Sequence, residues 1–376
     1  MPRPPVKIVD KLTITFLVDN NIEWFTKLPP GFSHELRQHL GEHDPPIDSV
    51  TGTPILDFEN YCCGAHGFSA LIETQVDGEE PHLVLFDTGP ESKSIARNIA
   101  SMKVPIERIE RVILSHWHSD HSGGLLSFLR LRQAAEQAQR DRGQGKATPV
   151  IADLHPDRPI ARGIAPLGKI LARLPADPTF EQIEELGAVV ETHAEGHAVA
   201  GDTIWVSGEV PRITEFEKGL LGAVRWIGNE TERKGDWVAE EDIMDERYAA
   251  IDLAGKGLVI FSACSHAGIV NVVKDATTKF QRPIYMLTRV QIVGGLHLAT
   301  PDLVDRIEPT VDFLANKLRP APMYVLPMHC SGFACKIALE KALGEGCVPA
   351  GTGIKVALDG NRELETKGMV IPPTIA

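Results

Sequence analysis

The chain has 376 residues, of which 43% are hydrophobic and 24% are charged, and its net charge is −13. This balance is typical of a globular protein with one large or two ordinary domains. The acidic charge argues against a general nucleic-acid binder, which is normally basic. Six cysteines in this length do not make a disulfide scaffold, and no apolar stretch reaches the roughly 18–20 residues of a membrane span. We expect a cytoplasmic protein without a signal peptide, and its oligomeric state stays open.

The first third of the chain predicts β-strands that are rich in β-branched residues and end in polar clusters. These strands cover residues 12–19, 68–74, 83–87 and 111–115. The second and third of them form a hairpin around Asp77 and Gly78. Residues 27–60 hold many Pro, Gly and His residues, which predicts irregular structure, and residues 92–102 predict a helix.

The middle of the chain begins with apolar residues at helical spacing, so residues 125–140 predict an amphipathic helix. A polar loop and a short strand at residues 150–154 follow. Between residues 156 and 250 the pattern is weak, with short helices and strands near residues 189–192 and 203–207. Residues 230–246 are strongly charged, and we expect them to face water.

The last third returns to strands that end in polar residues and are followed by helices. The expected strands are residues 257–263, 291–293 and 323–327, and the expected helices are residues 270–279, a helix from Pro301 and residues 331–342. Strands that alternate with helices indicate an α/β layered fold. In such folds, functional side chains gather on the loops at one edge of the sheets.

Residues 115–124 read SHWHSDHSGG and crowd three histidines and one aspartate into six positions. Imidazole nitrogen and carboxylate oxygen are donors that zinc and similar metals accept. His116 and His118 are two positions apart, so both can point the same way in an extended turn. Asp120 and His121 follow from the next tight turn. Two such pairs suit two metal ions about 3.5–4 Å apart, so the motif predicts half of a dinuclear site.

Residues from one loop cannot close two metal sites, so other strand ends must contribute. Three histidines follow predicted strands in the C-terminal half: His266, His297 and His329. For His297, a contact with substrate and a purely structural role are equally in keeping with the sequence.

The motif HWHSDH resembles the signature of the metallo-β-lactamase superfamily. This resemblance implies an αββα four-layer sandwich, here a single domain over residues 1–376 with an extended insertion or cap around residues 127–250. It also implies that Asp87, in the motif FDTG, orients the site by holding a metal-bound imidazole. The alternative for Asp87 is a simple turn-forming aspartate.

The order of motifs in the superfamily suggests the remote ligands. His329 matches the last ligand of the second metal, and His266 is the candidate to complete the first. Cys264 falls where many relatives have a bridging aspartate, so it is either a metal ligand or a small packing residue. In a rival assignment, His193 or His197 supplies the middle ligand.

Several further stretches narrow the resemblance, and they run in order from about residue 12 to residue 333: TFLVDNN, HGFSALIE, LFDTGP, GEVPRITEFE, GLVIFSACSHAGIVN, VGGLHL and LPMHCSGF. They resemble the branch of dihydropterin-6-yl-methyl-ribofuranosylaminobenzene 5′-phosphate synthases. This implies a transfer in which an aminobenzene ribosyl phosphate attacks a pterin-methyl diphosphate and diphosphate leaves. Arg212 would then be a phosphate clamp, or else a surface arginine. Asn20 and Asn21 are candidate substrate contacts, or else turn residues.

The same metals also suit hydrolysis, in which a metal-activated hydroxide attacks an ester, lactone or phosphoester and Asp120 orients it or takes up its proton. Hydrolysis is the first hypothesis and the pterin-type transfer is the alternative. A non-catalytic binding protein is disfavoured, because it has no need of an open two-metal site. We expect two divalent ions, zinc first, with iron, manganese or magnesium as alternatives. The expected partner is a small-molecule substrate, with or without phosphate, and neither a nucleic acid nor a membrane.

Overall fold

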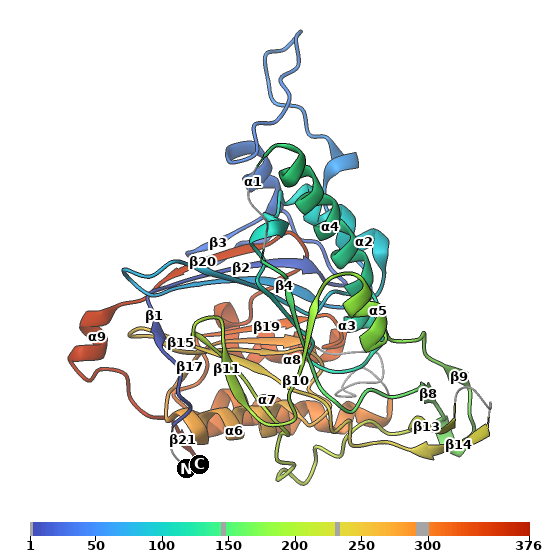
Figure 1. The fold of residues 1–376 in the computed structure, drawn as a ribbon. Helices are drawn as coiled ribbons and strands as arrows, with labels where there is room; N and C mark the ends of the chain where they lie inside the picture. The colour runs from blue at the N-terminus through green and yellow to red at the C-terminus, as the bar shows by residue number, and fades with distance from the viewer. Residues whose placement is uncertain (1–2, 144–147, 230–233, 291–300) are drawn as a thin grey trace.

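The computed structural model describes residues 3–143, 148–229, 234–290 and 301–376. Within these residues, two large β-sheets face each other, and helices cover the outer side of each sheet (Figure 1). No helix within the described residues has the length and apolar character needed to cross a membrane.

The first large sheet has the strand order β10-β7-β6-β5-β4-β2-β20-β3. Its strands are β2 (Lys11–Val18), β3 (Phe32–Ser33), β4 (Ser69–Gln75), β5 (His82–Phe86), β6 (Arg111–Ile113), β7 (Ile151–Leu154), β10 (Val189–Thr192) and β20 (Lys355–Asp359). The predicted hairpin is confirmed, because β4 and β5 pair in antiparallel fashion. β5, β6 and β7 are parallel, so the residues that follow them meet at one edge of the sheet.

The second large sheet has the order β11-β12-β15-β16-β17-β19, with β1 paired to β15. Its strands are β1 (Ile8–Val9), β11 (His197–Val199), β12 (Ile204–Val206), β15 (Ala249–Leu253), β16 (Gly257–Ser262), β17 (Ile284–Val290) and β19 (Tyr324–Met328). β16, β17 and β19 are parallel to one another. Their carboxyl ends therefore also share an edge.

The helices form the two outer layers, with a few short turns between elements. The α-helices are α1 (Glu35–Gly41), α2 (Ser92–Ser101), α3 (Ser119–Ser122), α4 (Leu125–Asp141), α5 (Phe180–Glu185), α6 (Ile269–Phe280), α7 (Ile307–Asp312), α8 (Phe333–Leu343) and α9 (Arg362–Thr366). The shorter helical segments are η1 (Phe58–Asn60), η2 (Ile106–Arg108), η3 (Pro166–Gly168), η4 (Pro301–Arg306), η5 (Phe313–Lys317) and η6 (Gly344–Gly346).

Three apolar clusters of buried side chains hold these layers together. The central cluster lies between the sheets and joins Phe86 of β5 to Phe261 of β16. A second cluster packs α2, α4 and α5 on the outer face of the first sheet. A third packs α6, α7 and α8 on the outer face of the second sheet. The predicted αββα layering is therefore confirmed, with burial of apolar surface at all three interfaces as its driving force.

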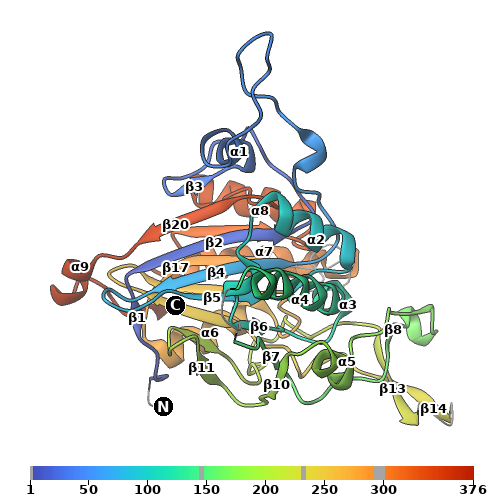
Figure 2. The same ribbon diagram turned by 45° about the horizontal axis from the view of Figure 1, so that its top comes forward.

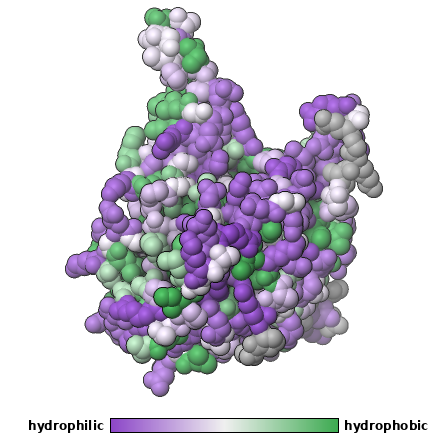
Figure 3. Space-filling model, turned by 90° about the vertical axis from the view of Figure 1, so that its left-hand side faces the viewer, coloured by the Kyte–Doolittle hydropathy of each residue, from purple (hydrophilic) through white to green (hydrophobic). Residues whose placement is uncertain are grey.

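A small sheet of order β14-β13-β8-β9 projects from the body (Figure 2). It consists of β8 (Arg162–Ile164), β9 (Ala172–Arg173), β13 (Ala223–Asn229) and β14 (Lys234–Ala239), and a further pair joins β18 (Leu318–Arg319) to β21 (Thr374–Ile375). The segment between α1 and η1 also projects from the body. Polar side chains cover much of the face in Figure 3, with apolar ones scattered among them, which is ordinary for a protein surface.

One stretch that was predicted to be irregular contains a helix, and one strand of the second sheet was not predicted. The stretch at residues 27–60 contains the helix α1, where Glu35 is fully buried and accepts a hydrogen bond from the backbone N–H of Cys62. The predicted strand at residues 291–293 lies outside the described residues, whereas β17 (Ile284–Val290) was not predicted.

Candidate metal centre

Strands of both sheets end around one point. β5 and β6 of the first sheet lead to Asp87 and to the loop at residues 115–122, and β16 and β19 of the second sheet lead to Cys264, His266 and His329. Because parallel strands bring their carboxyl ends to one edge, the polar residues that follow them gather there. Each sheet therefore supplies half of the candidate centre.

Asp87 fixes the start of the central loop. Its carboxylate accepts hydrogen bonds from the backbone N–H and the hydroxyl of Ser115, both at 2.7 Å, and lies 2.8 Å from Nδ1 of His121. Asp87 is fully buried and has a φ of 58°. With the proton of His121 on Nδ1, its Nε2 atom points toward the other ligand-type side chains, which is the usual way a carboxylate orients a ligating imidazole.

The two glycines after the central loop allow it to lie against the end of β5. A Cβ atom at Gly123 would lie 2.1 Å from the carbonyl oxygen of Pro90, and one at Gly124 would lie 2.1 Å from that of Thr88. No side chain fits at these distances, so close backbone packing explains the Gly-Gly pair.

His116, His118 and His266 form the first ligand group. Nε2 of His116 lies 3.0 Å from Nδ1 of His118 and 3.2 Å from Nε2 of His266, and all three side chains are buried. Burial lowers the pKa of His116 well below its ordinary value and that of His118 to about 3. The rings of His116 and His118 are therefore neutral and keep lone pairs for a metal. Three converging imidazole nitrogens are a donor set that zinc accepts.

Asp120, His121 and His329 form the second ligand group. Oδ2 of Asp120 lies 3.3 Å from Nε2 of His329 and 3.6 Å from Nε2 of His121. Burial opposes a charge on Asp120, but the neighbouring histidines, His121 and His329 foremost, together outweigh it and hold the pKa of this carboxyl well below its usual range. Oδ2 of Asp120 and Nε2 of His329 are buried and have no hydrogen-bond partner among the described residues. Buried polar atoms are normally paired, so these two fit a cation held between them.

Cys264 lies between the two groups. Its sulfur is 2.9 Å from Nε2 of His121, and it forms a cluster of ligand-type atoms with His116 and His121. Burial raises the pKa of the Cys264 thiol well above its ordinary value. A bound metal ion nonetheless removes the proton of a coordinating thiol. The position of the sulfur suits a ligand that the two groups share.

Two buried carboxylates support the ligand loops from behind. Glu246 accepts hydrogen bonds from the backbone N–H groups of His266 (2.8 Å) and Ala267 (2.7 Å). Asp245 accepts one from the backbone N–H of Trp117 at 2.7 Å. The expectation that this stretch faces water was wrong for both residues, which are 1% (Asp245) and 3% (Glu246) exposed. Their sequence looks like any charged stretch, because the backbone groups they bind are distant in the chain.

Arg162 completes this support, and nothing in the sequence singled it out. Its guanidinium donates to both oxygens of Asp245, at 2.5 and 3.3 Å, and to the carbonyl oxygen of Trp117 at 2.7 Å. It also forms an ion pair with Glu240. The turn between His116 and His118 is thus fixed through both the N–H and the C=O of its middle residue.

Asn20 joins two histidines on the outer side of the centre. Its Oδ1 lies 2.8 Å from Nδ1 of His329, and its Nδ2 lies 3.1 Å from Nδ1 of His66. An amide oxygen accepts and an amide nitrogen donates, so His329 carries a proton on Nδ1 and His66 accepts at Nδ1. Asp19 accepts a hydrogen bond from the backbone N–H of His329. Asn20 was a predicted substrate contact, whereas His66 was not predicted as a site residue.

The remaining predicted histidines are placed differently. His193 stacks on His197 with ring centroids 3.8 Å apart, and both cluster with the buried Asp153. This cluster shares no residue with the groups around the central loop. His297 lies outside the described residues.

Arg212, the candidate phosphate clamp, contacts other parts of the protein. Its guanidinium donates to the backbone carbonyl oxygens of Asp242 (3.2 Å) and Ile243 (3.3 Å). Its charge also opposes the effect of burial on Glu246, which raises the pKa of that carboxyl to about 7. The residue therefore lies close to the support behind His266.

The geometry can now be set beside known proteins. The family model of the metallo-beta-lactamase superfamily matches residues 67–237. A 7,8-dihydropterin-6-methyl-4-(beta-D-ribofuranosyl)-aminobenzene-5'-phosphate synthase of Methanocaldococcus jannaschii is 30% identical over 273 residues, which are 71% of this chain and 81% of the relative. The chain belongs to the metallo-β-lactamase superfamily. Proteins of this superfamily generally bind divalent metals, and the chain is an enzyme of the metallohydrolase or related transferase kind.

A solved structure of the metallo-β-lactamase superfamily has the same fold. The crystal structure of Tm1679, a metal-dependent hydrolase of the superfamily, is 20% identical, has a TM-score of 0.60, and is matched over 93% of this chain and 99% of that one. The fold protein YhfI from Bacillus subtilis is 11% identical, with a TM-score of 0.43 and coverage of 93% and 100%.

Proposed function

We propose that this enzyme holds two divalent metal ions, zinc first, and hydrolyses an ester, lactone or phosphoester. The observation that carries the proposal is the pair of adjacent ligand groups, which lie against each other with the sulfur of Cys264 between them. The proposed ligands are His116, His118 and His266 for the first ion and Asp120, His121 and His329 for the second. Iron, manganese and magnesium are the alternative metals, because His and Asp ligands accept several ions.

When bound, two such ions lower the pKa of a water molecule and neutralise charge that develops on the substrate. Asp120 is the proposed catalytic residue. Its Oδ2 atom has no hydrogen-bond partner within the described part of the chain, so it is available to the second ion and to orient the attacking water beside that ion. Asp87 keeps the ring of His121 in place beside it through the contact at Nδ1.

A second candidate function is the synthase reaction, in which an aminobenzene ribosyl phosphate attacks a pterin-methyl diphosphate and diphosphate leaves. The observation that favours it is the name of the relative that is 30% identical and matched over 81% of its length. The same two ligand groups would then hold ions that bind the leaving diphosphate. Arg212 would have to exchange its backbone carbonyl partners for phosphate in this reaction.

Three substrate mixtures separate the candidates. Metal-loaded protein is incubated with a phosphodiester, with a lactone, and with a pterin-methyl diphosphate plus aminobenzene ribosyl phosphate. Turnover of either of the first two supports hydrolysis, whereas diphosphate release that requires both pterin partners overturns it in favour of the transfer. The variant Asp120→Asn, purified in parallel, controls for contaminating hydrolases. Purified protein with less than about half an equivalent of any transition metal, and no activity on adding one, would contradict both candidates.

A further inference from the structure

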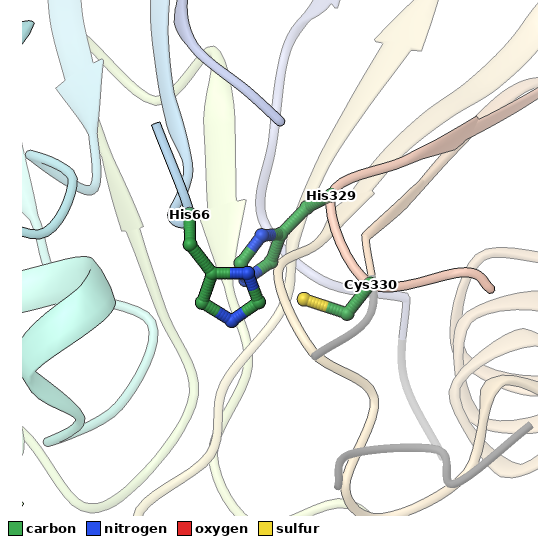
Figure 4. Close-up of side chains that lie close together, drawn as sticks. All are labelled: His66, His329 and Cys330. Atoms are coloured by element: carbon green, nitrogen blue, oxygen red, sulfur yellow. The ribbon is translucent and has the colours of Figure 1, made fainter. Parts of the chain in front are cut away.

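A further group of ligand-type side chains borders the proposed second metal site. His66, His329 and Cys330 each place one ligand atom within 4.8 Å of the others. Figure 4 shows the sulfur of Cys330 and the two imidazole rings facing one another. His329 also belongs to the group of Asp120 and His121, so the outer and the inner group share one imidazole.

The two groups differ in their access to solvent. The side chain of His66 is 44% exposed, whereas that of Asp120 is 16% exposed and that of His329 is fully buried. Cys330 is only 3% exposed. His66 is therefore the member of the two groups that is most open to an ion arriving from solvent.

The hydrogen bonds of Asn20 determine which nitrogen atoms of the shared cluster have lone pairs. His329 donates from Nδ1, so its Nε2 atom has the lone pair, and this atom lies 3.3 Å from Oδ2 of Asp120. His66 accepts from Asn20 at Nδ1 over 3.1 Å, so this nitrogen has a lone pair that a cation can take in place of the amide. Two imidazoles and one thiol are the donors of a thiophilic divalent ion such as zinc, cobalt or cadmium.

We propose that His66, Cys330 and His329 form an outer station that captures a thiophilic divalent ion and passes it to the inner group. Capture forms bonds from the ion to two imidazoles and to the sulfur of Cys330, whose proton leaves to water. Transfer breaks the bonds to His66 and Cys330, forms bonds to Asp120 and His121, and returns a proton to the sulfur. Nε2 of His329 serves both positions, and no electrons are exchanged. The inference rests on the proposed metal ligands and not on the choice between hydrolysis and transfer.

Rapid mixing of metal-free protein with limiting Co²⁺ tests this station. In the variant Cys264→Ser, which lacks the inner thiol, a thiolate–cobalt absorption band should rise and then decay as the ion moves inward. The same band should be absent when Cys330→Ser is added. Cys330→Ser and His66→Ala should each slow loading of the inner group about tenfold, while the final metal content stays at the wild-type value. His66→Gln is a more conservative replacement of His66 and should slow loading in the same way. Thermal unfolding of every variant checks that a slower rate does not come from misfolding.

Cys347→Ser is the matched control. This thiol follows η6 and lies beside Val325 at the start of β19, at the opposite end of the strand from His329. Its removal should leave the loading rate unchanged. Wild-type loading rates in both Cys330→Ser and His66→Ala would overturn the inference. So would a loss of one bound ion in either variant, because the outer residues would then be permanent ligands. A wild-type protein that takes up no ion at all would overturn the proposed function as well.

Discussion

Replacing Arg162 with methionine tests whether the buried ion pair behind the metal loop supports the fold. Arg162 is 3% exposed and Asp245 is 1% exposed, and the two are in direct contact. Methionine keeps much of the length of the side chain but leaves the carboxylate of Asp245 buried without its cation. Removing one partner of a buried pair costs about 3–5 kcal/mol. Glu240, the other partner of Arg162, is 14% exposed and can turn to water, so we assign most of the loss to Asp245.

Urea unfolding of the metal-free protein measures this loss as a lower midpoint at an unchanged slope. The double variant Arg162→Met/Asp245→Asn should be more stable than the sum of the two single changes predicts, by about 1–3 kcal/mol, because the unpaired charge is gone. Asparagine still accepts the hydrogen bond from Trp117 through its side-chain oxygen. The double variant should therefore also regain part of the metal affinity that Arg162→Met loses.

Arg225→Met is the matched control for this experiment. Arg225 also contacts Glu240, but its main partner is Asp157, whose side chain is 50% exposed. Exposed pairs contribute about 0–1 kcal/mol. If Arg162→Met destabilises the protein no more than Arg225→Met does, then the buried pair does not support the loop as we argue.

Four further changes probe the centre. Asp120→Asn should abolish turnover and lower metal content with the far-UV circular dichroism unchanged, and full initial rates would contradict its role. Asp87→Asn should weaken metal binding about 10–100-fold in competition with a chromogenic chelator, because an amide cannot accept all three of its hydrogen bonds; wild-type affinity would argue for a mere turn residue. Burial raises the pKa of Glu246 to about 7, so its contribution to the stability of metal-free protein is present below about pH 4.3 and is lost as the pH rises to 7. Glu246→Gln should reduce the fall in the free energy of unfolding of the metal-free protein between about pH 4.3 and 7. The same fall in the variant and in the wild type would refute this. Removing metal with a chelator should lower the unfolding temperature, whereas equal midpoints would show that no ion binds the folded state.

The central loop could be predicted because its information is local. His116, His118, Asp120 and His121 lie within six positions, and a strand before them and a Gly-Gly pair after them fix the direction of the side chains. The sequence predicts the remote residues Cys264, His266 and His329 less strongly, from the recognisable apolar strand that precedes each of them. The alternation of strands and helices predicted an α/β layered fold, and the resemblance to the metallo-β-lactamase superfamily implied its αββα arrangement.

The supporting residues could not be predicted, because their partners are backbone groups far away in the chain. Asp245 binds the N–H of residue 117, and Glu246 binds those of residues 266 and 267. In sequence, a carboxylate with such partners cannot be told from one that faces water. His66 was missed for a related reason: its link to His329 passes through Asn20, and only the packed structure brings these three segments together.

The distribution of the proposed ligands over the two sheets would connect metal binding to folding. Each ligand group takes two members from the central loop of the first sheet and one member, His266 or His329, from the second sheet. Between the sheets, Phe86 directly precedes Asp87 and packs on Phe261, with ring centroids 5.9 Å apart. Packing of this core therefore sets the distance between the two halves of each group. An ion that binds only when both halves are in register adds its binding free energy to the packing of the sheets. A bound ion would therefore stabilise the packing of the two sheets in addition to its role in the reaction. Arg162 and Glu246 are not proposed ligands, but they position the ligand loops. A change at either residue should therefore alter both the free energy of unfolding and the metal affinity.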